Sequence, residues 1–183
     1  MAVMAGCAFS AQAKNRADTL RCRSHYPPFE SKTLQGKLVG FDIHLGNALC
    51  IQMQAKCVWV ESQFYGMISA LKARKFDAIL SYIGITEERL KQIDFTVPLY
   101  DTLTQLIARK GTGLLMTADS LKGKTVGVRQ DAVQERYALA KWQSHGVNVV
   151  PYDNQAQVET DLVAGRQDVV LTDAAPAAIG FMK

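Results

Sequence analysis

Residues 71–81 read LKARKFDAILS, and residues 162–172 read LVAGRQDVVLT. Each run ends a helical segment with a polar turn and then enters a short apolar strand. A second pair of similar segments, GKLVGF at 36–41 and GKTVGV at 123–128, lies before these two runs. Its two segments are separated by nearly the same number of residues as the two runs are. The paired matches predict two similar α/β lobes with a boundary near residues 100–113, and the period is far too long for a solenoid repeat.

Helix-like and strand-like segments alternate along the chain. Apolar residues fall on one helical face over residues 43–53 and again over residues 64–71. Short strand-like runs lie around them, at residues 19–23, 57–60 and 76–80. This alternation predicts an α/β fold in which each lobe is a mostly parallel sheet flanked by helices. We place lobe one at residues 14–100 and lobe two at residues 101–183.

The carboxyl ends of the predicted strands indicate where a ligand binds. In open parallel sheets, ligands bind beyond these ends. In this chain they are Ser81-Tyr82 in lobe one and Thr172-Asp173 in lobe two. Two facing lobes would place the ligand in a cleft between them.

Composition and charge exclude several classes of protein. The chain has 183 residues, of which 48% are hydrophobic and 21% charged, as in an ordinary globular protein. Its net charge is +4, but the basic residues are scattered and form no run interleaved with aromatic residues, so we expect no nucleic-acid partner. No apolar run reaches the roughly 18 residues that a membrane span needs.

Motifs of enzymes and metal sites are weak. His25, His44 and His145 are isolated without metal-ligand spacing, and no GxSxG serine occurs. Residues 111–113 begin like a dinucleotide loop, but Met116 replaces the third glycine, so we interpret them as a plain loop. We therefore expect no catalytic residues, no metal and no cofactor.

The first residues differ in composition from the rest. Residues 1–13 carry no charge and end in Ala-Gln-Ala, and the polar stretch 14–18 follows. This pattern is typical of the back half of a secretory signal peptide with an A-x-A cleavage site; a disordered tail is the alternative. A lipoprotein box at residues 4–7, with Cys7 as the lipidated residue, is a further alternative.

The cysteines indicate a disulfide. Export would place the chain in an oxidising compartment. Cys50 and Cys57 are seven positions apart, which fits neither a CxxC redox motif nor a zinc knuckle, and no histidine lies near them. We predict a structural bond between these two, with Cys22 outside it.

Residues 81–89, SYIGITEER, follow a buried strand. Gly84 permits close backbone approach, and Thr86 has the character of a helix N-cap. Arg89 falls in the first helical turn, where a cation is unfavourable unless an anion lies nearby. The pattern is equally compatible with a carboxylate-binding arginine and with a surface arginine that pairs with one of the two neighbouring glutamates.

The run from Thr19 to Lys183 resembles the polar amino-acid-binding proteins of bacterial ABC importers (solute-binding protein family 3), and among them those that bind lysine, arginine and ornithine. The matching pieces in chain order are Tyr26-x-Pro28-Phe29, Val39-Gly40-Phe41-Asp42-Ile43, Phe76-Asp77-Ala78-Ile79, Ile85-Thr86-x-x-Arg89, Leu121-Lys122-Gly123-Lys124-x-Val126-Gly127-Val128 and Ala164-Gly165-Arg166-x-Asp168. The resemblance implies the type II periplasmic-binding fold, a periplasmic location, and delivery of an amino acid to a membrane permease. Lysine, arginine, ornithine and histidine are the implied ligands.

The resemblance also implies residue roles. Arg89 would clamp the α-carboxylate of the ligand, and Asp173 would take its α-ammonium group, with a helix N-cap as the other role for Asp173. Tyr26 and Phe64 would sandwich the ligand side chain; core packing is the alternative for both. Further contacts would come from Ser81, Tyr82, Gly84 and Gln134.

The chain departs from the family pattern at several points. Residues 23–25 read Arg-Ser-His and lack the acidic residue that usually precedes Tyr26, residues 131–133 replace a Gly-Ser/Thr-Thr turn, and Arg129 replaces an apolar residue. A dehydratase-like enzyme on the same fold, with Asp131 or Asp173 as acid–base group, and a decayed paralogue without ligand therefore stay open.

The end of the chain is also unlike the family. Family members return from lobe two to lobe one, and this sequence stops before that return. We therefore expect a C-terminally truncated protein with an incomplete lobe two. Apolar helix faces left without cover would favour a homodimer.

Overall fold

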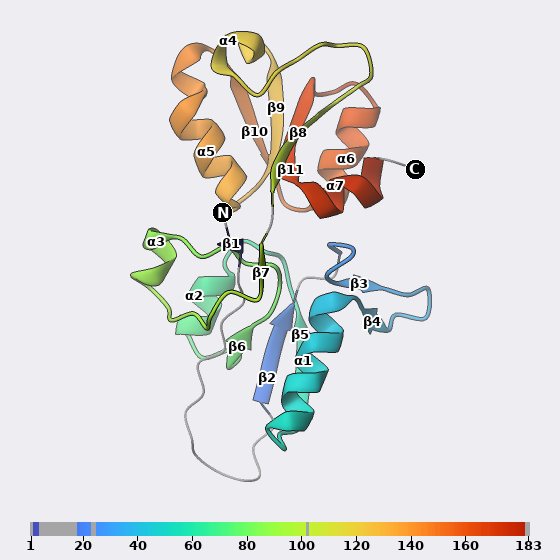
Figure 1. Ribbon diagram of the computed structural model, residues 1–183, viewed down its shortest axis with the longest axis vertical. Helices are drawn as coiled ribbons and strands as arrows, with labels where there is room; N and C mark the ends of the chain where they lie inside the picture. Colours follow the sequence, from blue (N-terminus) through green and yellow to red (C-terminus); the bar gives the residue numbers. More distant parts are fainter. Residues whose placement is uncertain (1, 4–17, 23–24, 102, 182–183) are drawn as a thin grey trace. The chain divides into compact units, whose positions relative to one another are not determined.

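The computed structural model describes residues 2–3, 18–22, 25–101 and 103–181 (Figure 1). The expected signal-peptide cleavage site and Cys7 lie outside these residues. The chain divides into two compact units, unit 1 over Met1–Thr102 and unit 2 over Leu103–Lys183. No helix among the described residues has the length and apolar character needed to cross a membrane.

Unit 1 is built on a three-stranded parallel sheet in the order β5-β2-β6. Its strands are β2 (Asp18–Cys22), β5 (Cys57–Glu61) and β6 (Ala78–Ile79). Its helices are α1 (Phe41–Gln52), α2 (Met67–Lys72) and α3 (Glu87–Leu90). Short antiparallel pairs join β3 (Ser31–Lys32) to β4 (Leu38–Val39) and β1 (Ala2–Val3) to β7 (Tyr100–Asp101).

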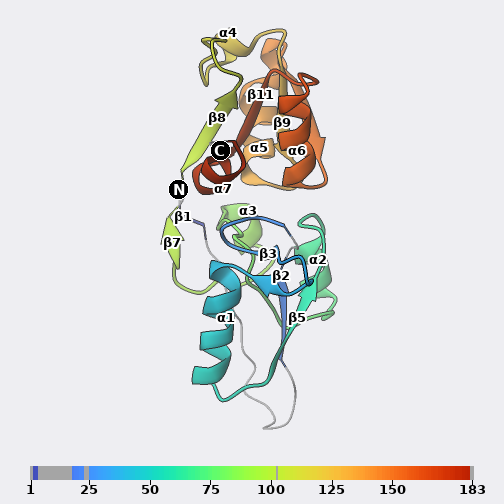
Figure 2. The same ribbon diagram turned by 90° about the vertical axis from the view of Figure 1, so that its right-hand side faces the viewer.

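Helices α1 and α2 pack on opposite sides of this sheet (Figure 2). Cys50 of α1 packs with Leu20 and Ala78, whereas Met67 of α2 packs with Ile79, the next residue of β6. Successive side chains of a strand point to opposite faces, so the two helices cover different faces. Burial on both sides is most complete at β6, where Ala78 and Ile79 face opposite helices and are both buried.

Unit 2 contains a four-stranded sheet in the order β10-β9-β11-β8. Its strands are β8 (Thr104–Ala108), β9 (Thr125–Arg129), β10 (Asn148–Tyr152) and β11 (Val169–Asp173). Strands β9, β10 and β11 are parallel, and β8 pairs antiparallel with β11. The helices are α4 (Ala118–Leu121), α5 (Val133–Lys141), the short 3-10 turn Gln143–His145, α6 (Gln155–Val163) and α7 (Ala174–Phe181). The α/β class with mostly parallel sheets is confirmed.

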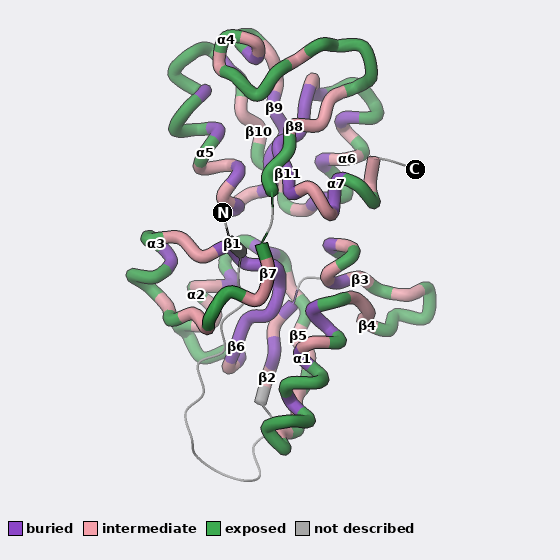
Figure 3. The backbone as a smooth tube through the Cα atoms, in the orientation of Figure 1, coloured by how far each residue is buried: buried purple, intermediate pink, exposed green. Residues whose placement is uncertain are grey.

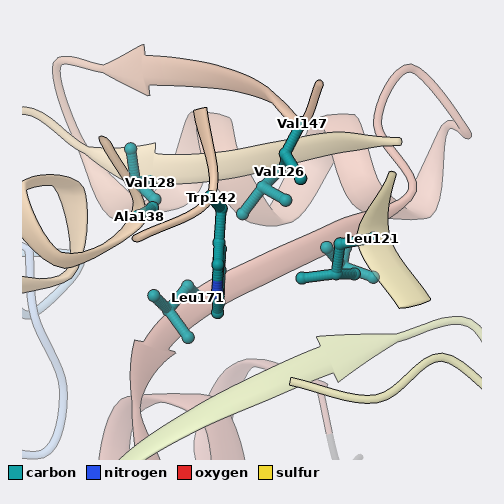
Figure 4. Packing of buried hydrophobic residues seen from close by; sticks show 8 residues of the cluster. Leu121, Val126, Val128, Ala138, Trp142, Val147 and Leu171 are labelled. Carbon is teal, nitrogen blue, oxygen red and sulfur yellow. The ribbon is translucent and has the colours of Figure 1, made fainter. Parts of the chain in front are cut away.

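Each face of the unit 2 sheet has its own apolar core. On the α5 face, Trp142 lies among Val126, Val128 and Leu171 (Figure 4). On the α6 face, Val170 of β11 packs with side chains of α6. The central strands β9 and β11 are consequently the most deeply buried part of this unit (Figure 3).

The predicted disulfide is confirmed. Cys50 lies near the end of α1 and Cys57 opens β5, with 6.0 Å between their Cα atoms. Cys22 is buried and takes no part in this bond. The bond therefore clamps the α1–β5 connection.

Replacement of both bonded cysteines by serine should lower the free energy of unfolding by about 2.5 kcal/mol, because a short loop is no longer closed in the unfolded chain. Urea denaturation of the Cys50→Ser/Cys57→Ser protein tests this expectation, and reduction of the unchanged protein should give a similar loss. Mass spectrometry of unreduced peptides that found Cys22 bonded to either partner would contradict the assignment.

Candidate functional site

The carboxyl edge of β6 in unit 1 carries a turn with strained backbone that buried side chains hold by hydrogen bonds. The Ser81 hydroxyl donates to Oε1 of Glu30 at 2.7 Å, and the backbone N–H of Tyr82 donates to Oδ2 of Asp42 at 2.8 Å. Tyr82 has φ of 47°, which is uncommon for a residue with a bulky side chain. Strained backbone of this kind concentrates at ligand sites, and here buried carboxylates hold it in place.

An aromatic cluster surrounds this turn. The ring of Tyr82 lies 5.5 Å from that of Tyr26 and 3.9 Å from that of Phe29, measured between centroids. The Tyr100 hydroxyl donates to Oδ1 of Asp42 at 2.8 Å. Burial and the adjacent Asp42 carboxylate raise the pKa of Tyr100, so this phenol stays a hydrogen-bond donor at neutral pH.

Arg89 is buried at the start of α3, with 4% of its surface exposed. Thr86 is the N-cap, as the sequence predicts, because its Oγ1 accepts from the Arg89 backbone N–H at 3.2 Å. The guanidinium Nη1 donates to the Gly84 carbonyl at 2.8 Å, and its Cζ lies 5.6 Å from the centroid of the Phe64 ring. The structure thus brings together three residues expected at the site, and it places Arg89 inside the protein and not at its surface.

Tyr26 and Phe64 are both almost fully buried within unit 1. Tyr26 packs in the cluster with Tyr82, and Phe64 belongs to the apolar core with Met67 and Ile79. Both rings therefore contribute to the core, as the alternative interpretation expects. Each also borders an expected site residue, Tyr82 in one case and Arg89 in the other.

In unit 2, two expected site residues from distant parts of the chain meet directly. Gln134 is the second residue of α5, and Asp173 is the last residue of β11. The Gln134 Nε2 donates to Oδ1 of Asp173 at 2.7 Å and also approaches Oγ1 of Thr104 at 3.3 Å. This pair fixes a buried carboxylate at the carboxyl edge of the unit 2 sheet.

The turn before α5 differs from a glycine-hydroxyl turn. Asp131 is exposed, has φ of 60°, and donates its backbone N–H to Oε2 of Glu135 at 2.7 Å. Burial raises the pKa of the Glu135 carboxyl, whereas the hydrogen bond that this carboxyl accepts from the Asp131 backbone N–H lowers it. The Glu135 carboxylate in the first turn of α5 therefore holds the turn that precedes this helix, at the end where the helix dipole favours a negative charge.

Several buried polar residues near the carboxyl edges of the two sheets were not predicted from the sequence. Glu30 and Asp42 support the turn in unit 1, and the buried Gln155 of unit 2 accepts a hydrogen bond from Thr172, which lies at the predicted strand end. An acidic residue between apolar neighbours is a signal that would have found Asp42, which lies between Phe41 and Ile43. Among the described residues, no three His, Cys, Asp or Glu side chains gather into a group that could hold a metal.

Comparison with known proteins gives consistent matches. The family model described as bacterial extracellular solute-binding proteins, family 3, matches residues 19–171. The chain is 51% identical over 158 residues to the lysine/arginine/ornithine-binding periplasmic protein of Escherichia coli (strain K12) and 46% identical over 158 residues to an L-arginine-binding protein of Pseudomonas aeruginosa. Each alignment covers 86% of this chain and 61% of the relative, so the chain spans about three fifths of their length.

Solved structures agree with these matches. An ancestral arginine-binding protein bound to arginine is similar with a TM-score of 0.85 and 34% identity, over 89% of this chain and 72% of the other. The ancestral amino acid-binding protein AncCDT-1, a precursor of cyclohexadienyl dehydratase, gives a TM-score of 0.81 and 27% identity, over 89% of this chain and 72% of that one. All four of these similar proteins are binding proteins by name.

Proposed function

We propose, on the premise that this chain belongs to the bacterial extracellular solute-binding proteins, family 3, that it is the periplasmic binding component of an ABC amino-acid importer. It binds one α-amino acid and presents it to a membrane permease. The names of the relatives support ligands such as lysine, arginine, ornithine and histidine.

The observation that carries this proposal is a buried charge of each sign, one on each unit. Arg89 in unit 1 offers a guanidinium fork, which suits a carboxylate. Asp173 in unit 2 offers a carboxylate that Gln134 orients, which suits an ammonium group. An α-amino acid carries a carboxylate and an ammonium group on one carbon atom, and each unit offers a group that complements one of these charges.

The remaining expected residues have supporting roles. The Ser81 hydroxyl donates its proton in a hydrogen bond to Glu30, which fixes the orientation of this side chain at the edge of the sheet. The Gly84 carbonyl holds the Arg89 fork, and the backbone of Tyr82 keeps this edge in one conformation. Tyr26 and Phe64 offer ring surface to the ligand side chain.

A thermal-shift screen of the twenty amino acids and ornithine tests the proposal. A ligand that binds only the folded state at a hundred times its Kd stabilises it by about 2.7 kcal/mol, which raises Tm measurably. We expect at least one α-amino acid to do so, and calorimetry then gives its Kd. If none shifts Tm, the chain is a paralogue that no longer binds ligand.

The proposal is of binding without turnover. At the level of the family, the similar proteins are named for binding. AncCDT-1 is itself named an amino acid-binding protein, and its link to a dehydratase is that it is a precursor of that enzyme. An enzyme would use Asp131 or Asp173 as the acid–base group. Incubation with a prephenate-like cyclic acid, followed by chromatography, should give no product; formation of a dehydrated product would favour the enzyme.

We further propose that unit 1 associates with a second copy of the chain. Several apolar side chains are exposed at the end of α1 and in β5, namely Leu49, Ile51, Met53 and Val58. Ile51 is 78% exposed. Exposed apolar side chains favour association with another apolar surface. Light scattering should show a mass that rises with concentration, and Ile51→Lys should reduce that rise. A single monomer mass at all concentrations would contradict this proposal.

A further inference from the structure

Asp42 lies in the first turn of α1, and none of its surface is exposed. Its two carboxylate oxygens accept hydrogen bonds from two separate segments of unit 1. Oδ2 accepts from the backbone N–H of Tyr82 at 2.8 Å, and Oδ1 accepts from the hydroxyl of Tyr100 at 2.8 Å. One carboxylate therefore joins the start of α1 to the turn after β6 and to strand β7, which lie 40 and 58 positions further along the chain.

The turn that Asp42 holds carries the expected site residues of unit 1. Tyr82 has φ of 47°, a left-handed conformation that a bulky residue keeps only where its surroundings fix it. Ser81 precedes it, and Gly84, two residues further on, accepts from Nη1 of Arg89 at 2.8 Å. The bond between Tyr82 and Asp42 thus fixes the backbone that leads to the Gly84 carbonyl, and this carbonyl orients the guanidinium.

Tyr100 connects this turn to the segment that joins the two units. Its ring stacks on those of Tyr82 and Phe29, with centroids 5.4 and 5.3 Å apart, so packing places the ring and its hydroxyl reaches Asp42. Tyr100 is the first residue of β7, and unit 2 begins at Leu103. The Asp42 carboxylate consequently bonds both the site turn and the strand that leads directly into unit 2.

We propose that Asp42 and Tyr100 are positioning residues of the amino-acid site, which couple the turn at Tyr82 to the segment that leads into unit 2. The proposal rests on the proposed function and adds two residues to those expected at the site. Asp42 has no exposed surface, so it acts through the turn and not by contact with the ligand. Because coupling free energies are reciprocal, a ligand that fixes the turn also strengthens the attachment of β7.

A purely structural role for this bond makes a different prediction. A bond that only stabilises the fold changes the free energy of unfolding, but nearly all molecules stay folded and keep their affinity. Unit 2 offers a matched pair for comparison, because the Tyr152 hydroxyl donates to Oδ2 of Asp161 at 2.8 Å. This bond has the same chemistry and length as that from Tyr100 to Asp42, and it joins β10 to α6.

Calorimetry with the full chain, using the amino acid that the thermal-shift screen identifies, measures the effect on affinity. Tyr100→Phe removes only the hydroxyl and should weaken binding by about 5-fold, whereas Asp42→Ala should weaken it by roughly 30-fold. Asp42→Asn should recover most of this loss, because its oxygen can accept from the Tyr82 N–H while its amide donates to the Tyr100 oxygen. Tyr100→Phe added to Asp42→Ala should cost no further affinity, since Tyr100 acts through Asp42. Tyr152→Phe should leave the affinity unchanged.

Hydrogen exchange of the Tyr82 amide, followed by NMR, reports on the turn itself. Without ligand, exchange should be several-fold faster in Tyr100→Phe than in the unchanged protein, because the Asp42 carboxylate loses the bond that holds it in place. Tyr152→Phe should leave this exchange rate as it is. Addition of the amino acid to the unchanged protein should slow it.

The possible results separate this inference from the proposed function. Unchanged affinity of Tyr100→Phe, in a protein that binds an amino acid, overturns the inference and leaves the proposed function intact. Equal losses of affinity in Tyr100→Phe and Tyr152→Phe would also overturn it, because the effect would then follow from stability. Failure of every amino acid to bind the unchanged protein removes the proposed function and the role of both residues with it. Circular dichroism checks that Asp42→Ala folds; if it does not, the Tyr100→Phe result decides.

Discussion

Amino-acid binding should weaken by about 3 kcal/mol, more than 100-fold, when Arg89 is replaced by alanine. The α-carboxylate would lose a charge-assisted bidentate partner in a site where only 4% of the surface of Arg89 is exposed. Arg89→Lys should recover only part of this loss, because an ammonium group keeps the charge but not the planar fork. Calorimetry against the ligand identified by the screen measures both variants.

The neighbouring residue supplies the matched control for this experiment. Leu90 lies on the same short helix and is 52% exposed, so Leu90→Ala should leave the affinity unchanged. Arg89→Ala also removes the donor to the Gly84 carbonyl, and circular dichroism should therefore confirm that the protein stays folded. Equal affinities of Arg89→Ala and the unchanged protein would remove Arg89 from the site.

Local sequence patterns were sufficient for the main elements of the fold. The strand predicted at residues 19–23 is β2 at Asp18–Cys22, and the helical face over residues 43–53 is part of α1. These segments are predictable because their apolar period is set by burial on one or two faces. Strand β8 was not predicted: it pairs antiparallel at the sheet edge, and the first two of its five residues are exposed, so its pattern carries little signal.

The site residues were predictable only in part. Thr86 and Arg89 can be predicted because the helix-cap pattern that contains them spans only four positions. The residues that hold the turn at Tyr82 lie far from it in the sequence. Glu30 lies 51 positions before its partner Ser81, and Asp42 lies 40 positions before Tyr82. Spacing cannot reveal such pairs, because they exist only once the sheet has formed.

The same limit applies to Arg129 in unit 2. Its substitution for an apolar residue is visible in the sequence, but its burial at the end of β9 depends on the pairing of β9 with β10 and β11. A charged residue at a strand end is usually solvated.

Asp173→Asn should weaken amino-acid binding by about 2–3 kcal/mol, because the ligand ammonium would lose a charged acceptor. The substitution keeps the shape of the side chain, and its amide oxygen can still accept from the Gln134 Nε2 that now bonds Asp173 Oδ1. The free energy of unfolding should therefore change much less than the affinity. Asp119→Asn, at an exposed position of α4, is the matched control for the loss of one negative charge in unit 2.

Combining Asp173→Asn with Arg89→Ala tests whether the two residues hold opposite ends of one ligand. If they do, each variant removes a different contact, and the two losses of binding free energy should add to within about 0.5 kcal/mol when the ligand keeps its position. A double variant no weaker than Arg89→Ala alone would show that the ligand does not use Asp173 once Arg89 is lost. Unchanged affinity of Asp173→Asn, together with loss of turnover of a cyclic acid, would instead assign Asp173 to acid–base chemistry.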